Sequence, residues 1–229
     1  MKHGASRGDT MARYLFPRWS NKVVPMVIAF GLLPLAAAAT GGLYYYGGNK
    51  HLEVGYSPEQ PVAYSHKLHA GDLGIDCRYC HSNVERSAKA SVPPTETCMN
   101  CHAKVRTDSL KLLPVRESFA ADTPIPWIRV HNLPDYAYFD HSAHTSAGVG
   151  CVSCHGRVDQ MPQVKQTEPL SMGFCLDCHR NPGPSLREPS LVTKMDLDVK
   201  SSAVSLGTGV ASLNGRTVKP PVHCSGCHR

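Results

Sequence analysis

The sequence predicts one transmembrane helix followed by a domain of short helices with little other regular secondary structure. Three observations support this fold class. Residues 23–46 form an uncharged apolar run, and all ten cysteines of the chain fall into C-x-x-C pairs. Glycine and proline together make up 37 of 229 residues, whereas aromatic residues make up only 7%. We therefore expect a thin aliphatic core that other groups complete.

The formal net charge of +6 is concentrated at the N-terminus. Residues 1–22 contain five basic side chains and one acidic side chain, and the remaining 207 residues contain 19 basic and 17 acidic ones. A nucleic-acid-binding protein would carry its excess positive charge on the folded domain. The charge distribution excludes that class.

The apolar run from Val23 to Tyr46 is long enough to cross a bilayer. As a helix, its 24 residues reach ~36 Å, and the hydrocarbon core is ~30 Å thick. Trp19 precedes the run and three tyrosines end it, as in the aromatic belts of membrane interfaces. Because the basic residues lie on its N-terminal side, the positive-inside rule places residues 1–22 in the cytoplasm.

A cleaved signal peptide is the alternative for this segment, with small residues at positions 36–39 near a cut site. The run exceeds the ~7–15 apolar residues of a typical signal peptide, which favours a retained anchor. Both interpretations place residues 47–229 outside the cytoplasm. We expect a single-pass protein of the bacterial cytoplasmic membrane with a periplasmic domain.

Every cysteine belongs to one of five C-x-x-C-H pentads. Two thiols three positions apart can each form a thioether with one haem vinyl group, and the next imidazole then binds the iron. The pentads predict five covalently bound haem c groups and a multihaem cytochrome c fold with class III-like duplicated units. We number the pentads one to five: Cys77, Cys80 and His81; Cys98, Cys101 and His102; Cys151, Cys154 and His155; Cys175, Cys178 and His179; Cys224, Cys227 and His228.

Disulfides and structural zinc are the alternative interpretations of these cysteines. A zinc site would use two pairs as four ligands and would need no histidine after each pair. Five pairs also leave one over. Haem attachment explains both the pairs and the histidines.

The chain contains an internal repeat, residues 64–102 and 139–179, and the fifth haem near 224–228 lies outside it. Each copy opens with an aromatic-x-His-x-x-His element that is followed by two pentads. The copies are offset by 75 residues at the first histidine of the element and by 74 at the first pentad. The duplication predicts that four histidines are the sixth ligands of the four repeat haems, with the pairing left open: His66, His69, His141 and His144.

The fifth haem needs a ligand from elsewhere. We predict His131, which has no counterpart in the first copy, where Tyr56 occupies the equivalent position. Met161 and Met172 are the alternatives, since a thioether sulfur is a normal axial ligand. Three further histidines are weaker candidates, and the first of them lies on the cytoplasmic side of the predicted anchor: His3, His51 and His223.

Two proline-containing segments are expected to be irregular. Residues 113–135 contain four prolines and predict an extended connection. Residues 181–222 are first rich in proline and then small and polar, which predicts a surface excursion.

A haem whose two axial positions are both filled passes electrons and binds no substrate. The sequence therefore predicts a membrane-anchored electron conduit that takes electrons from quinol, with no catalytic side chain of its own. The alternatives are a multihaem reductase with one open iron and a structural protein without redox function.

The order of features resembles the pentahaem cytochrome c subunit of alternative complex III, a quinol-oxidising assembly. The resemblance lies in the five pentads, in residues 130–135 leading into residues 139–144, and in residues 170–174 leading into Cys175. It implies an iron–sulfur subunit and a polytopic quinone-binding subunit as partners, and a periplasmic cytochrome c or copper protein as acceptor. A free-standing multihaem quinol dehydrogenase, similar to the membrane-anchored tetrahaem family, is the alternative.

Overall fold

The computed structural model describes residue 17 and residues 19–48, 52–196, 204–207, 210–213 and 215–228. It divides into two compact units, residues 1–48 and 49–229, each of which is described by itself. The candidate ligands His3 and His51 lie outside the described residues.

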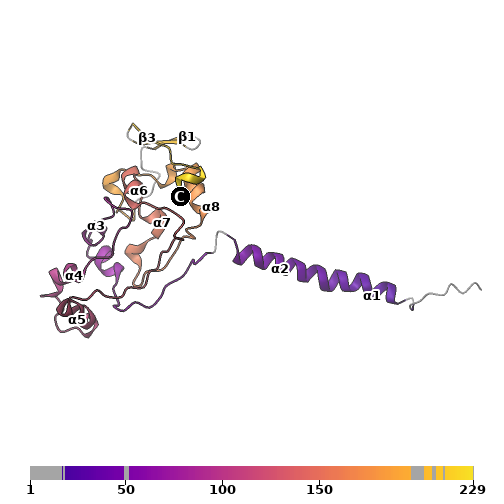
Figure 1. Ribbon diagram of the computed structural model, residues 1–229, viewed down its shortest axis with the longest axis horizontal. Coiled ribbons are helices and arrows are strands. Elements are labelled where there is room, and N and C mark those ends of the chain that lie inside the picture. Colours follow the sequence, from indigo (N-terminus) through magenta and orange to yellow (C-terminus); the bar gives the residue numbers. More distant parts are fainter. Residues whose placement is uncertain are drawn as a thin grey trace, which may run out of the picture. The chain divides into compact units, whose positions relative to one another are not determined.

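The first unit contains one long apolar helix (Figure 1). It comprises α1 (Ser20–Val27), a π-helical turn η1 (Ile28–Leu32) and α2 (Leu33–Tyr46). Pro34 has no N–H to donate and its ring crowds the carbonyl four residues earlier, so the wider π turn before it has a local cause. The helix has a most apolar stretch of 18 residues with a mean hydropathy of 2.1 and no buried residue. Its length and composition suit a membrane span, and they suit a signal sequence equally.

The second unit consists mainly of short helices, which confirms the prediction. The single sheet of the described residues is small and antiparallel, with β1 (Val204–Gly207), β2 (Val210–Leu213) and β3 (Arg216–Val218) in that order. In its register, residue 204 pairs with 213 and residue 211 with 218. The helices are η2 (Lys67–Asp72), α3 (Cys77–Cys80), α4 (Thr95–His102), η3 (Leu110–Leu112), α5 (Leu113–Ala121), α6 (His141–Ala147), α7 (Val152–His155), η4 (Val158–Gln160), α8 (Met172–Arg180), η5 (Gly183–Ser185), η6 (Pro189–Leu191) and η8 (Cys224–Gly226).

Each pentad lies on its own short helix: α3, α4, α7 and α8 carry the first four pentads, and the 3-10 turn η8 carries the fifth. Side-chain caps fix where two of these helices begin. The Asp76 carboxylate accepts a hydrogen bond from the backbone of Arg78 at the start of α3, and Ser171 caps α8 in the same way.

The prediction of an extended connection over residues 113–135 is wrong for its first part. Leu113–Ala121 form helix α5, with Pro114 in the first turn. A proline there costs no hydrogen bond, because the N–H groups of the first turn have no helical acceptor. The hydroxyls of Thr95 and Ser118 lie 2.7 Å apart and join α5 to α4.

The prediction of a surface excursion over residues 181–222 is also wrong in part. Residues 183–194, which we call the clamp segment, contain three fully buried side chains: Leu186 is 0% exposed, and Arg187 and Val192 are each 1% exposed. Backbone hydrogen bonds tie the clamp segment to residues 148–151, which lead into the third pentad. The N–H groups of residues 187, 150 and 151 donate to the carbonyls of residues 148, 185 and 192 at 2.7, 3.1 and 3.0 Å.

The apolar core of the described residues is small, in agreement with the composition. Its buried hydrophobic side chains are Val62, Val115, Met161, Leu186, Val192 and Leu213. Two of the six belong to the clamp segment, so this segment contributes strongly to the packing.

Replacing Leu186 by alanine tests the role of the clamp segment. Truncating a fully buried leucine costs about 2–5 kcal/mol of unfolding free energy, measured by denaturant unfolding of the purified protein. Leu191→Ala in the same segment is the control, because that side chain is 38% exposed. Equal effects of the two substitutions would contradict the packing described here.

Candidate functional site

All ten cysteines are free thiols, and no disulfide joins any of them. Burial raises the pKa of Cys151 to about 11 and that of Cys154 to about 12, so these thiols stay protonated in the chain without cofactor. Within the described ranges, no three histidine, cysteine, aspartate or glutamate side chains converge as a protein metal site would require.

The structure brings each repeat histidine opposite the last histidine of one pentad. The first histidine of each element pairs with the first pentad of its copy, and the second histidine pairs with the second pentad. The ring centroids lie 6.5 Å apart for His66 and His81, 6.2 Å for His69 and His102, 6.4 Å for His141 and His155, and 6.1 Å for His144 and His179.

These separations fit one iron between each pair of rings. A metal–nitrogen bond to histidine is ~2.0 Å and the nitrogen lies ~1.1 Å from its ring centroid, so two rings that ligate one metal from opposite sides have centroids ~6.2 Å apart. The residues present therefore fit haem groups at the first four pentads. The sequence left open which repeat histidine pairs with which pentad. Both copies bring corresponding pairs of rings together.

Backbone carbonyls fix which ring nitrogen is available. The Nδ1 atoms of seven histidines lie 2.6–3.0 Å from a backbone carbonyl oxygen. A carbonyl only accepts, so Nδ1 carries the proton and Nε2 keeps its lone pair for a metal. The seven are His69, His81, His102, His141, His144, His179 and His228.

Burial also keeps several imidazoles neutral. It lowers the pKa of His66 to about 4 and that of His155 to about 3, with a further contribution from neighbouring histidines. It lowers the pKa of His144 as well. Because a neutral imidazole is the form that binds a metal, these rings are prepared for ligation near neutral pH.

The fifth pentad has a different environment. Its His228 Nδ1 lies 3.0 Å from the carbonyl of Tyr136, and the Tyr136 ring lies 5.9 Å away. His131 lies instead at the third pentad, edge-on to the His155 ring at 4.5 Å, with its Nε2 buried and without a hydrogen-bond partner. The prediction that His131 binds the fifth iron stays a prediction, and this placement gives it no support.

The alternative ligands occupy different places. Met161 is 7% exposed and its carbonyl accepts a hydrogen bond from Lys67. Met172 is 61% exposed and begins α8, the helix of the fourth pentad. His223 bonds through Nδ1 to the Ser225 hydroxyl at 3.1 Å.

Burial is the main cause that raises the pKa of four pentad thiols, and thiols of another pentad raise it further. The second pentad acts in this way on Cys80, and Cys77 acts on Cys151. The fourth pentad acts on Cys154, and Cys227 acts on Cys175. These interactions agree with pentads that follow one another in the order two, one, three, four, five. Figure 1 shows α4, α3, α7 and α8 following one another in the same order.

Sequence reasoning missed the clamp segment as a support for this row. The Arg187 guanidinium lies against Gly150, where a Cβ atom would collide with it, and Nη1 donates to the carbonyl of Lys194 at 2.6 Å. Its Nε and Nη2 atoms are buried without partners. No local sequence motif indicates the contact between Arg187 and Gly150, because the two residues lie 37 positions apart.

Asp76 links the clamp segment to the first pentad. Its carboxylate accepts from Nε of Arg78 and from the hydroxyl of Thr193, both at 2.9 Å. The clamp segment therefore holds the first and third pentads together, at the junction of the two copies. The Arg78 hydrogen bond lowers the pKa of Asp76 to about 2.

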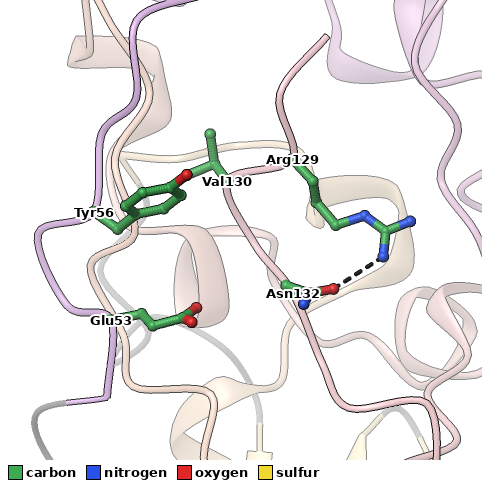
Figure 2. A pocket seen from close by; sticks show the side chains of 5 residues that line it. All are labelled: Glu53, Tyr56, Arg129, Val130 and Asn132. Carbon is green, nitrogen blue, oxygen red and sulfur yellow. Dashed lines mark hydrogen bonds between the residues drawn. The ribbon is translucent and has the colours of Figure 1, made fainter. Parts of the chain in front are cut away.

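A cavity of about 390 Å³ has a lining that contains no pentad residue. Figure 2 shows its lining, in which Arg129 donates to the Asn132 side chain at 2.9 Å. No thiol or imidazole lines it, so it is not a haem-attachment site. The lining residues are Glu53, Tyr56, Arg129, Val130 and Asn132.

Comparisons with known proteins match most of the second unit. A family profile described as "Cytochrome c7 and related cytochrome c" matches residues 62–117 and 137–229, which include all five pentads. Over 133 residues the chain is 36% identical to the "Menaquinone reductase, multiheme cytochrome c subunit" of Nitratidesulfovibrio vulgaris strain Hildenborough. The alignment covers 58% of this chain and 57% of that relative, so the chain spans little more than half of the relative's length.

Asp76→Asn tests the link at the junction through its pH dependence. The pKa of Asp76 is about 2 in the folded chain and 3.8 ordinarily. As the pH falls from about 4 to about 2, the unfolded state takes up this proton first, so the stability that the carboxylate contributes is lost. We expect the wild type to be more stable than the variant at neutral pH, measured by thermal unfolding, and the difference to shrink towards pH 2. A difference that is constant with pH would contradict the link.

Proposed function

This chain belongs to the family of cytochrome c7 and related cytochromes c, and we propose that it is a membrane-anchored pentahaem cytochrome. In this proposal it passes electrons from a quinol-oxidising membrane complex to a periplasmic acceptor. The family implies covalently bound haem c and confirms the multihaem fold class predicted from the sequence. The homology to a menaquinone reductase subunit agrees with a role in electron transfer within a larger complex.

The observation that carries the proposal is the set of four histidine pairs, 6.1–6.5 Å apart. When bound, haem c supplies one-electron redox chemistry. In each pentad two cysteines would hold the group as thioethers, and the last histidine would ligate its iron. At the first four pentads a repeat histidine would supply a further ligand, so these four sites would serve electron transfer and not catalysis.

In this proposal the row of pentads forms a route with two ends. The second pentad lies at one end and the fifth at the other, so an electron donor and an acceptor would be served at opposite ends. The order also means that the two copies meet through their first pentads. The clamp segment and Asp76 hold this junction, where the route passes from one copy to the other.

The partners in this proposal are those of an alternative-complex-III type of assembly. An iron–sulfur subunit and a polytopic quinone-binding subunit would deliver electrons, and a periplasmic cytochrome c or copper protein would accept them. Helix Ser20–Tyr46 would anchor the chain in the cytoplasmic membrane, with the pentads on the periplasmic side.

A free-standing quinol dehydrogenase is the second candidate, and the cavity favours it. A carboxylate, a phenol and a guanidinium line the cavity, and these groups can bond a quinol hydroxyl.

Purification in mild detergent separates the two candidates. We expect the protein to co-purify with other subunits and its haems to be reduced by quinol only in that complex. The control is Glu53→Gln in the complex, which removes the cavity's acid and leaves quinol-dependent reduction unchanged. An isolated subunit that oxidises quinol, with loss of activity in Glu53→Gln, would overturn the proposal in favour of the second candidate.

Substitution of distal histidines tests the pairing. His66→Met replaces nitrogen by sulfur at the first-pentad haem and should raise its midpoint potential, measured by spectroelectrochemical titration. The shift should persist in a Cys98→Ser/Cys101→Ser background and vanish in a Cys77→Ser/Cys80→Ser background. The reverse pattern would show that His66 serves the second pentad. His223→Met is the control and should leave every potential unchanged.

A further inference from the structure

The two aromatic residues that open the repeats contact both histidines of their element in the same geometry. The Tyr64 ring stacks on His69 with centroids 4.5 Å apart and an angle of 22°, and it meets His66 edge-on at 4.8 Å and 87°. The Phe139 ring stacks on His144 at 4.5 Å and 29°, and it meets His141 edge-on at 4.7 Å and 88°. One flat side chain therefore holds two rings almost at right angles to each other.

The backbone alone does not explain this likeness. In the first copy the histidines flank and enter a π-helical turn, η2, whereas in the second they lie on the α-helix α6. Different helical geometries would turn the side chains differently. The distances between ring centroids nevertheless agree between the two copies to within about 0.1 Å. The two copies therefore share the aromatic side chain and its contacts, and they do not share the helix type.

We propose that Tyr64 and Phe139 are positioning residues that set the orientation of both distal imidazoles in their copy. This rests on the proposed function, in which those imidazoles bind haem iron. The angles between the repeat histidines and the last histidines of the pentads follow the same trend in both copies. The first-pentad rings of the two copies are nearly parallel to their partners, at 2° and 8°, and the second-pentad rings are tilted, at 67° and 36°.

The contribution of the aromatic ring differs among the four histidines. The Nδ1 atoms of His69 and His144 bond to carbonyls within their own elements at 2.9 and 2.7 Å, and that of His141 bonds to the Ala88 carbonyl at 2.8 Å. Nδ1 of His66 is buried without a hydrogen-bond partner. His66 therefore depends most on its aromatic neighbour, Tyr64.

Electron paramagnetic resonance of the oxidised protein provides a readout besides activity. The g-anisotropy of a low-spin haem with two imidazole ligands depends on the angle between the imidazole planes. Tyr64→Leu should shift the signals of the first and second haems, most strongly the first, and leave the third and fourth unchanged. Phe139→Leu should shift the third and fourth signals, with a smaller change at the third because the Ala88 carbonyl still holds His141.

Matched variants separate positioning from general damage. Tyr64→Phe keeps both ring contacts and places the aromatic residue of the second copy in the first. It should therefore retain the wild-type spectrum. Phe119→Leu removes a half-exposed aromatic ring on α5 and should change no signal. If Tyr64→Leu does not mature, Phe139→Leu and Tyr64→Phe still provide the test.

Two failures are distinguishable. Intact mass first establishes that each variant carries its haems. Unchanged signals in a fully loaded Tyr64→Leu or Phe139→Leu protein would overturn the positioning role. A wild-type spectrum without bis-histidine centres would overturn the proposed function itself.

Discussion

Pairs of imidazoles facing each other across 6.1–6.5 Å are the constraint on which this structure depends. A haem tied to a short helix by two thioethers still needs a ligand from a distant part of the chain. The aromatic-x-His-x-x-His element meets this need in both copies. In each copy it precedes the two pentads in the sequence and lies opposite their histidines in the fold. Carbonyl bonds at Nδ1 hold His69, His141 and His144 in the tautomer that can bind iron, and burial lowers the pKa of His66 and His144. Regular secondary structure can then be sparse, because the ligand pairs define the interior.

The arrangement of the two copies follows from the same constraint. The first pentads of the two copies meet at the junction. The clamp segment packs there through the buried Leu186 and Arg187, and it bonds to Asp76 through Thr193. The fifth pentad follows the fourth in this order, in agreement with the effect of Cys227 on the pKa of Cys175, which adds to that of burial. The two copies and the fifth pentad thus form one row of five pentads. The family match over residues 62–117 and 137–229 covers this whole arrangement.

The sequence was informative where chemistry is local. Pentad spacing, the repeat and the apolar run predict the fold class and the ligand types, because each depends on residues a few positions apart. The pairing of histidines with haems could not be predicted, since two ligands three positions apart can face either iron. Long-range contacts could not be predicted either, because no residue near Arg187 in the sequence indicates its contact with Gly150. Helix α5 could not be predicted because a proline such as Pro114 suits the first turn of a helix as well as a loop. His131 was chosen by the absence of a counterpart, and the structure places it beside His155.

The most direct test of this account is an electron paramagnetic resonance redox titration of the wild-type protein purified in detergent. It resolves low-spin centres with two nitrogen ligands from those with nitrogen and sulfur ligands, and it counts them. The account predicts at least four bis-histidine centres that titrate as one-electron couples. Three or fewer such centres, or thiols free of haem, would contradict the ligand pairs on which the structure is built.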